Sequence, residues 1–303
     1  MHLRRDLHIA DGSLVLEIGG GSIPHPRSTV VVDRFPDADG AAQRGGGALV
    51  LEGRPLIQAD GRHLPFRDKT FDYSIASHVI EHLSPTGAVE LAAELYRVAR
   101  AGYVEAPSIV YELVRDIPEH LLVVHCDAEG SIHVAPKPPR DVTQAFIDPL
   151  FYDPDFCWVV EKHNQLFFTG TEWTTEVSVI SHRDWRDLLE FCSGEWAEAT
   201  VQAGLADSAG SLWRAQLRRD AGALARHYLP SAVIRAVKEV RDRNRAERSR
   251  PRTSAMTRDA AFALLVCPSC HSPLNKGGER HVTCSECGLQ FTIRRDGIPK
   301  LIV

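Results

Sequence analysis

Short apolar runs alternate with polar, glycine-rich segments along the first 110 residues of the chain. Apolar runs of this length that end in turn residues are typical of buried strands. They predict strands at residues 14–18, 29–33, 56–60, 71–77 and 103–106. Apolar residues at helical spacing predict a helix over 87–100. Strands that alternate with helices indicate an α/β protein with a mostly parallel sheet and helices on both faces.

The pattern changes after residue 106. The sequences LLVVHC and SIHVAPK, on either side of a turn at 127–130, predict a hairpin. Residues 141–181 are rich in aromatic side chains, which suits a cap over a binding pocket and equally suits an ordinary core. Apolar stripes predict further helices at 182–191, 211–228 and 232–248.

These patterns divide the chain into four segments. They are a core at 1–140, an aromatic-rich cap or substrate-binding segment at 141–210, a basic helical segment at 211–253 and a small C-terminal domain at 254–303.

Composition and charge narrow the class of protein. The chain has 303 residues, of which 44% are hydrophobic and 25% charged, as in folded globular proteins. We expect a cytoplasmic protein with no membrane partner, because no run approaches the length of a membrane helix and the first residues lack the apolar core of a signal peptide. The net charge of −5 is uneven, with −15 on residues 1–210 and +8 on residues 211–252. The basic segment suits either a polyanion or the acidic part of the same chain.

A glycine-rich loop, LEIGGGS, follows the first predicted strand. Its three glycines allow the backbone to turn sharply and to lie against a ligand. In dinucleotide-binding folds such a loop opens a helix that holds a pyrophosphate, but Pro24 and Pro26 leave little room for that helix here. Glu17 would also repel a pyrophosphate and attract an ammonium or sulfonium group. The loop therefore favours a cationic ligand without phosphates.

Further carboxylates come at the ends of the next two predicted strands. Asp33 ends the second strand, a position from which a carboxylate can accept hydrogen bonds from both hydroxyls of a ribose. Asp60 and Gly61 end the third, where an adenine amine could be bound. Each carboxylate alone is also consistent with a solvated loop, but the ordered set indicates a nucleoside at the carboxyl edge of the sheet.

The segments LEIGGGS, VVVDRF, QADGRHLPFRDKTFDYSIASHVIEHL and ELYRVARAGYVEAPS resemble, in order and spacing, the class I S-adenosylmethionine-dependent methyltransferases. The resemblance covers residues 12–108. It implies a Rossmann-like sheet of seven strands that binds S-adenosylmethionine, with S-adenosylhomocysteine as the product. The chain departs from the family pattern at two points: Ile23 stands where the family has its third glycine, and the helix after the loop is shortened to a turn with proline.

The same resemblance implies a set of cofactor contacts on the loop and the strand ends. The loop would hold the methionine end, the acidic residues the ribose and the adenine, and the end of the fourth strand the inner face of the cofactor. The expected set is Glu17, Gly19, Gly20, Gly21, Asp33, Arg34, Asp60, Gly61, Ser77 and His78.

Histidines and a glutamate follow the fourth strand. Methyl transfer is an in-line displacement, for which the protein supplies alignment and, for a protonated acceptor, a general base. His78, Glu81 and His82 have the spacing of one helix face, and His120 lies in the segment after the fifth strand. Glu81, His82 and His120 are the catalytic candidates.

The sequence H-x-x-E-H at 78–82 resembles the E-x-x-E-H metal motif of ubiquinone-pathway O-methyltransferases and small-RNA 2′-O-methyltransferases, with His78 in place of the first Glu. Metal binding, a plain helix face and a general-base role for His82 or His120 all remain open at this point.

Four of the seven cysteines form two close pairs near the C-terminus. Cys267 and Cys270, followed by Cys284 and Cys287, have the spacing of a structural zinc site with four thiolate ligands. Residues 262–303, which end in F-x-I-R-x-D-G-I-P-x-L, resemble the small zinc-ribbon activator subunit of eukaryotic RNA and protein methyltransferases and its bacterial relatives. The resemblance implies an activator fused to its enzyme, with an apolar face that covers hydrophobic surface on the catalytic domain.

The leading functional hypothesis is methyl transfer from S-adenosylmethionine to a small-molecule acceptor, such as a specialised metabolite or a sugar-containing precursor, because the aromatic-rich segment suits an enclosed pocket. The alternative is an RNA or protein methyltransferase, motivated by the activator-like ribbon and the basic residues at 211–252. Nucleic acid is the less favoured partner because the rest of the chain is acidic. Two further hypotheses stay open: a non-catalytic cofactor-binding scaffold, and a reaction in which the sulfonium donates its aminocarboxypropyl chain or cyclises.

Overall fold

The computed structural model describes residues 7–21, 24–37, 40, 48–138, 160, 164–193, 256–278 and 280–303. The helices predicted at 211–228 and 232–248, and most of the aromatic-rich segment, lie outside these residues. The described part of the core and the C-terminal residues belong to one compact unit.

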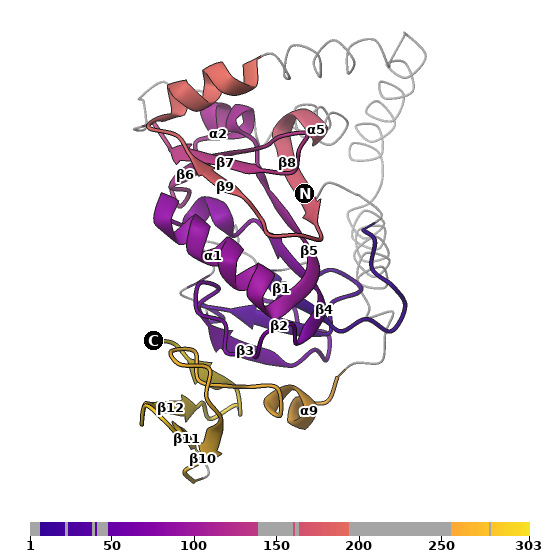
Figure 1. Ribbon diagram of the computed structural model, residues 1–303, viewed down its shortest axis with the longest axis vertical. Helices are drawn as coiled ribbons and strands as arrows, with labels where there is room; N and C mark the ends of the chain where they lie inside the picture. The colour runs from indigo at the N-terminus through magenta and orange to yellow at the C-terminus, as the bar shows by residue number, and fades with distance from the viewer. Residues whose placement is uncertain are drawn as a thin grey trace, which may run out of the picture. The chain divides into compact units, whose positions relative to one another are not determined.

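Six strands of the core lie side by side in one sheet (Figure 1). They are β1 (Val15–Ile18), β2 (Val30–Asp33), β3 (Leu56–Ala59), β4 (Phe71–Ser77), β5 (Ala99–Pro107) and β8 (Phe168–Trp173). Their order is β3-β2-β1-β4-β5-β8; β8 runs antiparallel to β5 and the other neighbours are parallel. The five predicted strands are confirmed, and β5 extends further than its prediction at both ends. The chain reverses its winding direction between β1 and β4, which opens a crevice at their carboxyl ends.

One face of this sheet packs on helix α1 (Pro85–Val98). The helix begins with Ser84, whose hydroxyl accepts a hydrogen bond from the Gly87 amide, and proline follows at the first helical position. Leu91 and Leu95 are 1% exposed, because they face the sheet. The helix predicted at 87–100 is thus confirmed over residues 87–98, and it ends two residues earlier than expected.

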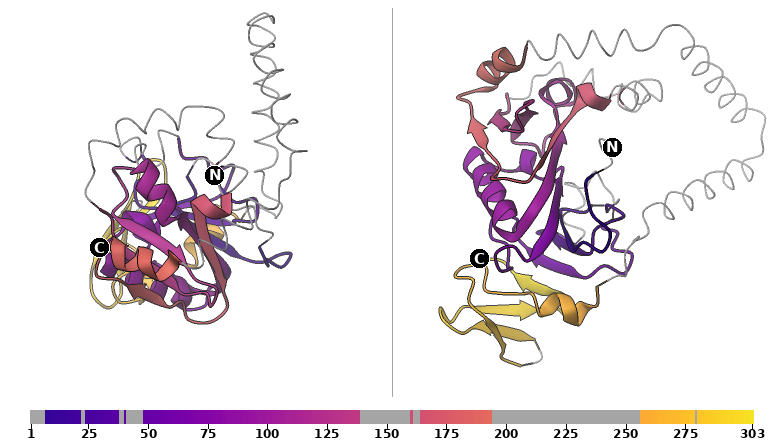
Figure 2. Two further views of the ribbon diagram at one scale, coloured as in Figure 1. Left: turned by 90° about the horizontal axis from the view of Figure 1, so that it is seen from above. Right: turned by 45° about the vertical axis from the view of Figure 1, so that its right-hand side comes forward.

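The opposite face of the sheet is covered differently from the expectation of helices on both sides. Tyr73 and Tyr103 pack there with Val15, and the partly buried side chains of Leu7 and Ile9 lie against them. Figure 2 shows this N-terminal segment and α1 on opposite sides of the strands. Among the described residues, this N-terminal segment and no helix lies against Val15, Tyr73 and Tyr103.

A second, smaller sheet has three strands, β6 (Leu122–Cys126), β7 (Ile132–Pro136) and β9 (Val179–Ser181). The predicted hairpin is confirmed as the antiparallel pair β6–β7. It does not join the main sheet. Two short helices, α2 (Ile109–Arg115) and α5 (Asn164–Phe167), lie near the end of β5, and residues 185–193 are helical close to the predicted 182–191.

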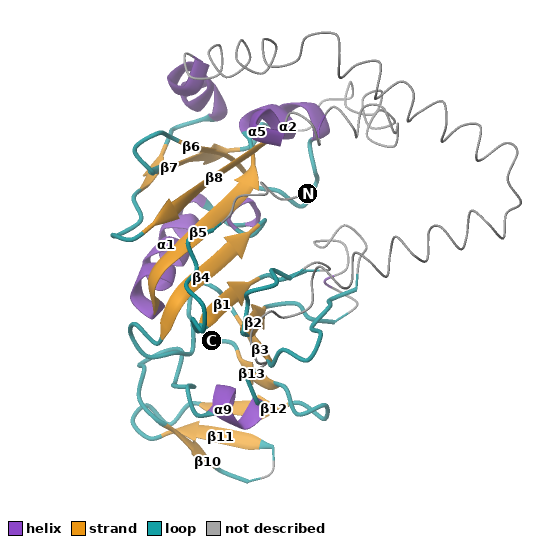
Figure 3. Cartoon of the chain, turned by 90° about the vertical axis from the view of Figure 1, so that its right-hand side faces the viewer, coloured by secondary structure: helices purple, strands orange, loops and turns teal. Residues whose placement is uncertain are grey.

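The C-terminal domain contains α9 (Arg258–Phe262), β10 (Leu274–Lys276), β11 (His281–Cys284), β12 (Gln290–Ile293) and β13 (Pro299–Leu301). Strand β13 pairs in parallel with β3, so the four ribbon strands continue the main sheet into ten strands (Figure 3). The described core itself contributes six strands where seven were expected.

The ribbon also docks on the core through apolar side chains. Leu301 is fully buried, and Leu265 forms a bridge with Phe66, which is fully buried as well. The Val266 amide donates a hydrogen bond of 2.9 Å to the Pro65 carbonyl. The L-P-F sequence at 64–66 thus forms a docking site for the ribbon, which agrees with the expected apolar contact. No helix in the described part of the chain is long and apolar enough to cross a bilayer.

Candidate functional site

A cavity of about 560 Å³ opens at the carboxyl ends of the parallel strands. The loops after β1 to β5, the beginning of α2 and its following loop, and the beginning of β8 surround it. Its lining includes all but two of the expected cofactor and catalytic residues: Gly19, Gly20, Gly21, Asp33, Arg34, Asp60, Gly61, Ser77, His78, His82 and His120. Glu17 and Glu81 are buried next to this lining and are not part of it.

The glycine loop lies at the cavity wall, and at Gly19 a side chain would clash with a neighbour. Gly19 has φ +66°, and a Cβ atom there would lie 2.7 Å from Cγ2 of Val79. Gly21 has φ +56°, also in the left-handed region. The described residues after the loop, 24–29, form a turn and no helix, as the two prolines predict. The loop can therefore cradle a ligand without a helix N-terminus behind it.

Glu17 lies beneath this loop, 4% exposed. Both of its carboxylate oxygens accept the amide proton of His25 at 3.0 Å. Burial raises the pKa of Glu17 to about 7, although Ser28, His25 and Arg54 act in the opposite direction. Since the side chain does not line the cavity, its role in ligand binding would be to hold the loop.

The carboxylates after β2 and β3 lie in a network of arginines. Asp60 receives hydrogen bonds from Arg62 at 2.8 and 3.0 Å and an ion pair from Arg34 at 2.8 Å. Burial by itself raises the pKa of Asp60, but the hydrogen bonds and charges of the two arginines outweigh it and hold the pKa below its usual value. Asp33 is 8% exposed and accepts the Phe35 amide at 2.7 Å. Both carboxylates are therefore held in fixed positions at the cavity wall.

At the other end of the cavity, His78 has φ +58°, a strained conformation for a residue with a side chain. Its ring lies between two fully buried carboxylates: Nδ1 is 3.2 Å from Glu81 and Nε2 is 3.6 Å from Glu105. Burial alone lowers the pKa of His78, but these two carboxylates outweigh it and raise the pKa. Residues Ile80–His82 form a 3-10 turn, so the α-helical face predicted for 78–82 is wrong.

His82 and His120 lie together although 38 positions separate them, with ring centroids 4.6 Å apart. The Nδ1 atom of His82 is 3.0 Å from the Glu119 carbonyl, and Nδ1 of His120 is 2.5 Å from the buried carboxylate of Glu112. Glu81 lies within 4.0 Å of His120. The structure therefore brings together the three catalytic candidates of the sequence.

Several cavity residues were not found from the sequence. Tyr111 and Phe168 line the end near the histidines, and Phe35 and Arg62 line the end near the glycines. Arg62 lies inside the sequence motif that resembles the methyltransferases, so its place in the cavity wall could have been predicted from that motif. Phe168 belongs to the aromatic-rich segment 141–181, which suited a cap over a pocket, whereas nothing local marked Tyr111, since its place depends on how α2 packs.

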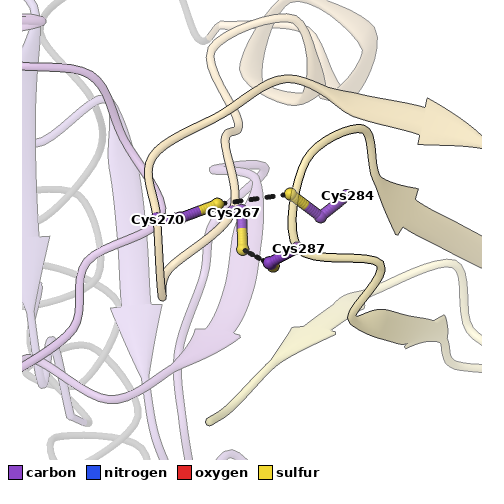
Figure 4. A group of neighbouring side chains, drawn as sticks. All are labelled: Cys267, Cys270, Cys284 and Cys287. Atoms are coloured by element: carbon purple, nitrogen blue, oxygen red, sulfur yellow. Dashed lines mark hydrogen bonds between the residues drawn. The ribbon is translucent and has the colours of Figure 1, made fainter.

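The four clustered cysteines converge from two loops of the ribbon (Figure 4). Sγ of Cys267 is 3.7 Å from that of Cys287, and Sγ of Cys270 is 3.3 Å from that of Cys284. Zinc–sulfur bonds of about 2.3 Å in a tetrahedron require sulfurs roughly 3.8 Å apart. The four thiols thus fit a zinc ion.

Comparison with known proteins supports this description. Residues 22–104 match the protein family described as a methyltransferase domain. No curated protein matches the chain. Residues 22–104 are therefore similar to a methyltransferase domain, and the fold of the core is Rossmann-like.

Solved structures also show similarity to the chain. A SAM-dependent methyltransferase of Thermotoga maritima has 20% identity and a TM-score of 0.25 over 36% of this chain; the match covers 54% of that protein, about half of its length. A protein of Pyrococcus horikoshii has 21% identity and a TM-score of 0.26 over 46% of this chain and 72% of its own. A complex of the Trm112 methyltransferase activator of Haloferax volcanii with a methyltransferase has 14% identity and a TM-score of 0.34 over 55% of this chain and 84% of its own.

Proposed function

We propose that this protein transfers a methyl group from S-adenosylmethionine to a small-molecule acceptor, with the C-terminal ribbon as a structural zinc domain. The observation that carries the proposal is one cavity whose two ends have different chemistry. Glycines and carboxylates surround one end, and histidines with aromatic side chains surround the other.

The first end suits the cofactor. Gly19 and Gly21 would lie against the methionine part, Asp33 would accept hydrogen bonds from the ribose hydroxyls, and Asp60 with Gly61 would contact the adenine. The bound cofactor would supply an activated methyl group. The glycine conformations and the restrained carboxylates support this assignment, because both prearrange the wall before any ligand arrives.

The second end suits a small acceptor. Tyr111, Phe168 and Ile117 provide apolar surface, while His82 and His120 provide ring nitrogens. Aromatic walls with few polar groups are typical of small-molecule sites. The ring nitrogens can either accept a proton from the acceptor or hold a cation.

A structural zinc ion would be held by the four ribbon cysteines. Hydrogen bonds from Ser272 lower the pKa of Cys270 to about 6, which favours the thiolate form of this one ligand, whereas the pKa of Cys267 is raised by burial. Cys267 and Cys284 are buried in the common hydrophobic core, so the ion would stabilise the surface that docks on β3.

Calorimetric titration with S-adenosylmethionine and S-adenosylhomocysteine tests the cofactor assignment. We expect micromolar binding that Asp33→Ala and Asp60→Ala each weaken at least tenfold. Transfer of a labelled methyl group to candidate acceptors would follow. Folded, zinc-loaded protein that binds neither compound would contradict the proposal and favour the scaffold hypothesis.

The alternative acceptor, an RNA or a protein, rests on the activator-like ribbon and on the basic residues at 211–252. These basic residues lie outside the described part of the chain. If RNA were the acceptor, its affinity would fall steeply with salt, because phosphate contacts release counterions. Salt-insensitive methylation of a small acceptor would favour our proposal.

A further inference from the structure

We infer that Glu81, His82 and His120 bind a divalent first-row transition-metal ion at the acceptor end of the cavity, separate from the zinc of the ribbon. One ligand atom from each of the three residues lies within 4.8 Å of the others. Two of the residues, His82 and His120, line the cavity.

The hydrogen bonds around the two histidines engage Nδ1 of each ring and leave Nε2 as the nitrogen that can bind an ion. A carbonyl oxygen only accepts, so Nδ1 of His82 must donate to Glu119. A carboxylate oxygen likewise accepts, so Nδ1 of His120 donates to Glu112. In the neutral rings both Nε2 atoms then carry lone pairs. A histidine that donates its other nitrogen to a carboxylate or carbonyl is the usual arrangement at metal sites.

The carboxylate of Glu81 supplies the second, independent observation. The side chain is fully buried, and its Oε2 atom has no hydrogen-bond partner among the described residues. A buried carboxylate oxygen without a partner is costly. A cation bound between Glu81 and the two Nε2 atoms would remove this cost.

His78 is not one of the ligands, although the sequence motif included it. Its two nitrogens lie next to the carboxylates of Glu81 and Glu105, at 3.2 and 3.6 Å. His120, which is distant in sequence, takes its place. Two histidines and one carboxylate with open positions are typical of catalytic sites for zinc, iron and related divalent ions.

The role of this ion rests on the proposed function. At the acceptor end it would bind an oxygen of the acceptor and lower the pKa of a bound hydroxyl group. The two histidines would then act as ligands and not as general bases, and the acceptor would be a hydroxylated molecule.

Titration of zinc-loaded, full-length protein with Co²⁺ tests the inference by calorimetry and absorbance. We expect one further equivalent, with the weak visible bands of nitrogen and oxygen ligands and without the intense thiolate bands of a cysteine site. Glu81→Gln and His120→Gln should weaken Co²⁺ binding more than tenfold. Glu112→Gln should weaken it about tenfold or more, because it acts through His120.

His133→Gln is the matched control, since His133 is also buried and paired with a carboxylate, Asp127 at 2.9 Å. It should leave Co²⁺ binding unchanged. Absence of a second equivalent in the wild-type protein would overturn the inference without any variant. Equal losses of Co²⁺ affinity in His120→Gln and His133→Gln would also overturn the inference. Binding of S-adenosylmethionine, measured on the same samples, tests the proposed function separately.

Discussion

Arg294 of the ribbon donates two hydrogen bonds, of 2.6 and 2.9 Å, to the carboxylate of Asp37 in the loop after β2. The same guanidinium group donates to Gln58 at 3.2 Å, and Gln58 in turn donates to the Arg34 carbonyl at 3.1 Å. Arg34 forms an ion pair with Asp60. The ribbon is therefore connected by polar contacts to the loop that forms one wall of the cavity.

This connection predicts an effect of Arg294→Ala on cofactor affinity. The loop at Asp33 and Arg34 should lose its polar contacts with the ribbon, while the apolar contacts between the ribbon and the core remain. Because the pair is partly exposed, we expect a loss of up to about 1 kcal/mol, or roughly a two- to fivefold rise in the Kd for S-adenosylmethionine. Calorimetry measures it, with the exposed neighbour Arg295→Ala as the control. An Arg294→Ala protein with unchanged affinity would show that the contact is only structural.

The glycine loop offers a sharper test of the cofactor site. In Gly19→Ala the new methyl group meets Val79 at 2.7 Å, and the left-handed backbone costs about 1–2 kcal/mol in addition. We expect S-adenosylmethionine to bind at least tenfold more weakly. Gly12→Ala carries a similar backbone penalty at φ +80°, with no atom within 4 Å of the new methyl group. It should lower the melting temperature but keep the cofactor affinity.

Glu17 predicts a specific pH dependence of stability. Its pKa is about 7 in the folded protein and near 4.5 when unfolded. The folded state thus holds this proton more tightly, so the contribution is complete below pH 4.5 and is lost as the pH rises through 7. It amounts to about 3 kcal/mol at most. Glu17→Gln should reduce the fall in unfolding free energy between pH 5 and pH 8, measured by denaturant titration. Exposed Glu129→Gln should leave that fall as it is in the wild type.

Zinc removal should weaken the whole described unit and not the ribbon alone. Cys267 and Cys284 share one hydrophobic cluster with Leu16, Leu91 and other core residues. We expect Cys270→Ser to lose zinc, measured by metal analysis, and to lower the melting temperature of the single transition. Ser285→Ala, an exposed change between two ligands, should keep both. A separate early transition for the ribbon, with the main transition unchanged, would contradict this coupling.

The strands, α1 and the cluster of four cysteines could be predicted from the sequence because each depends on local order. A run such as VVVD forms a strand wherever its neighbours bury it, and two C-x-x-C pairs form a site in two adjacent loops. The glycine loop and the carboxylates after β2 and β3 could also be predicted as parts of one site, since parallel strands end at the same edge of the sheet.

Only the tertiary structure decided the contacts between distant segments. His120 reaches Glu81 because the residues after α2 fold back over the turn at Ile80–His82, and that turn is 3-10 where the spacing alone suggested an α-helix. Glu17 lies under the loop because alternate strand residues face opposite sides of the sheet. Arg294 meets Asp37 across 257 positions, through the pairing of β13 with β3. Hydrophobic periodicity specifies which face of an element is buried, whereas the partner on that face is selected by packing among all elements at once.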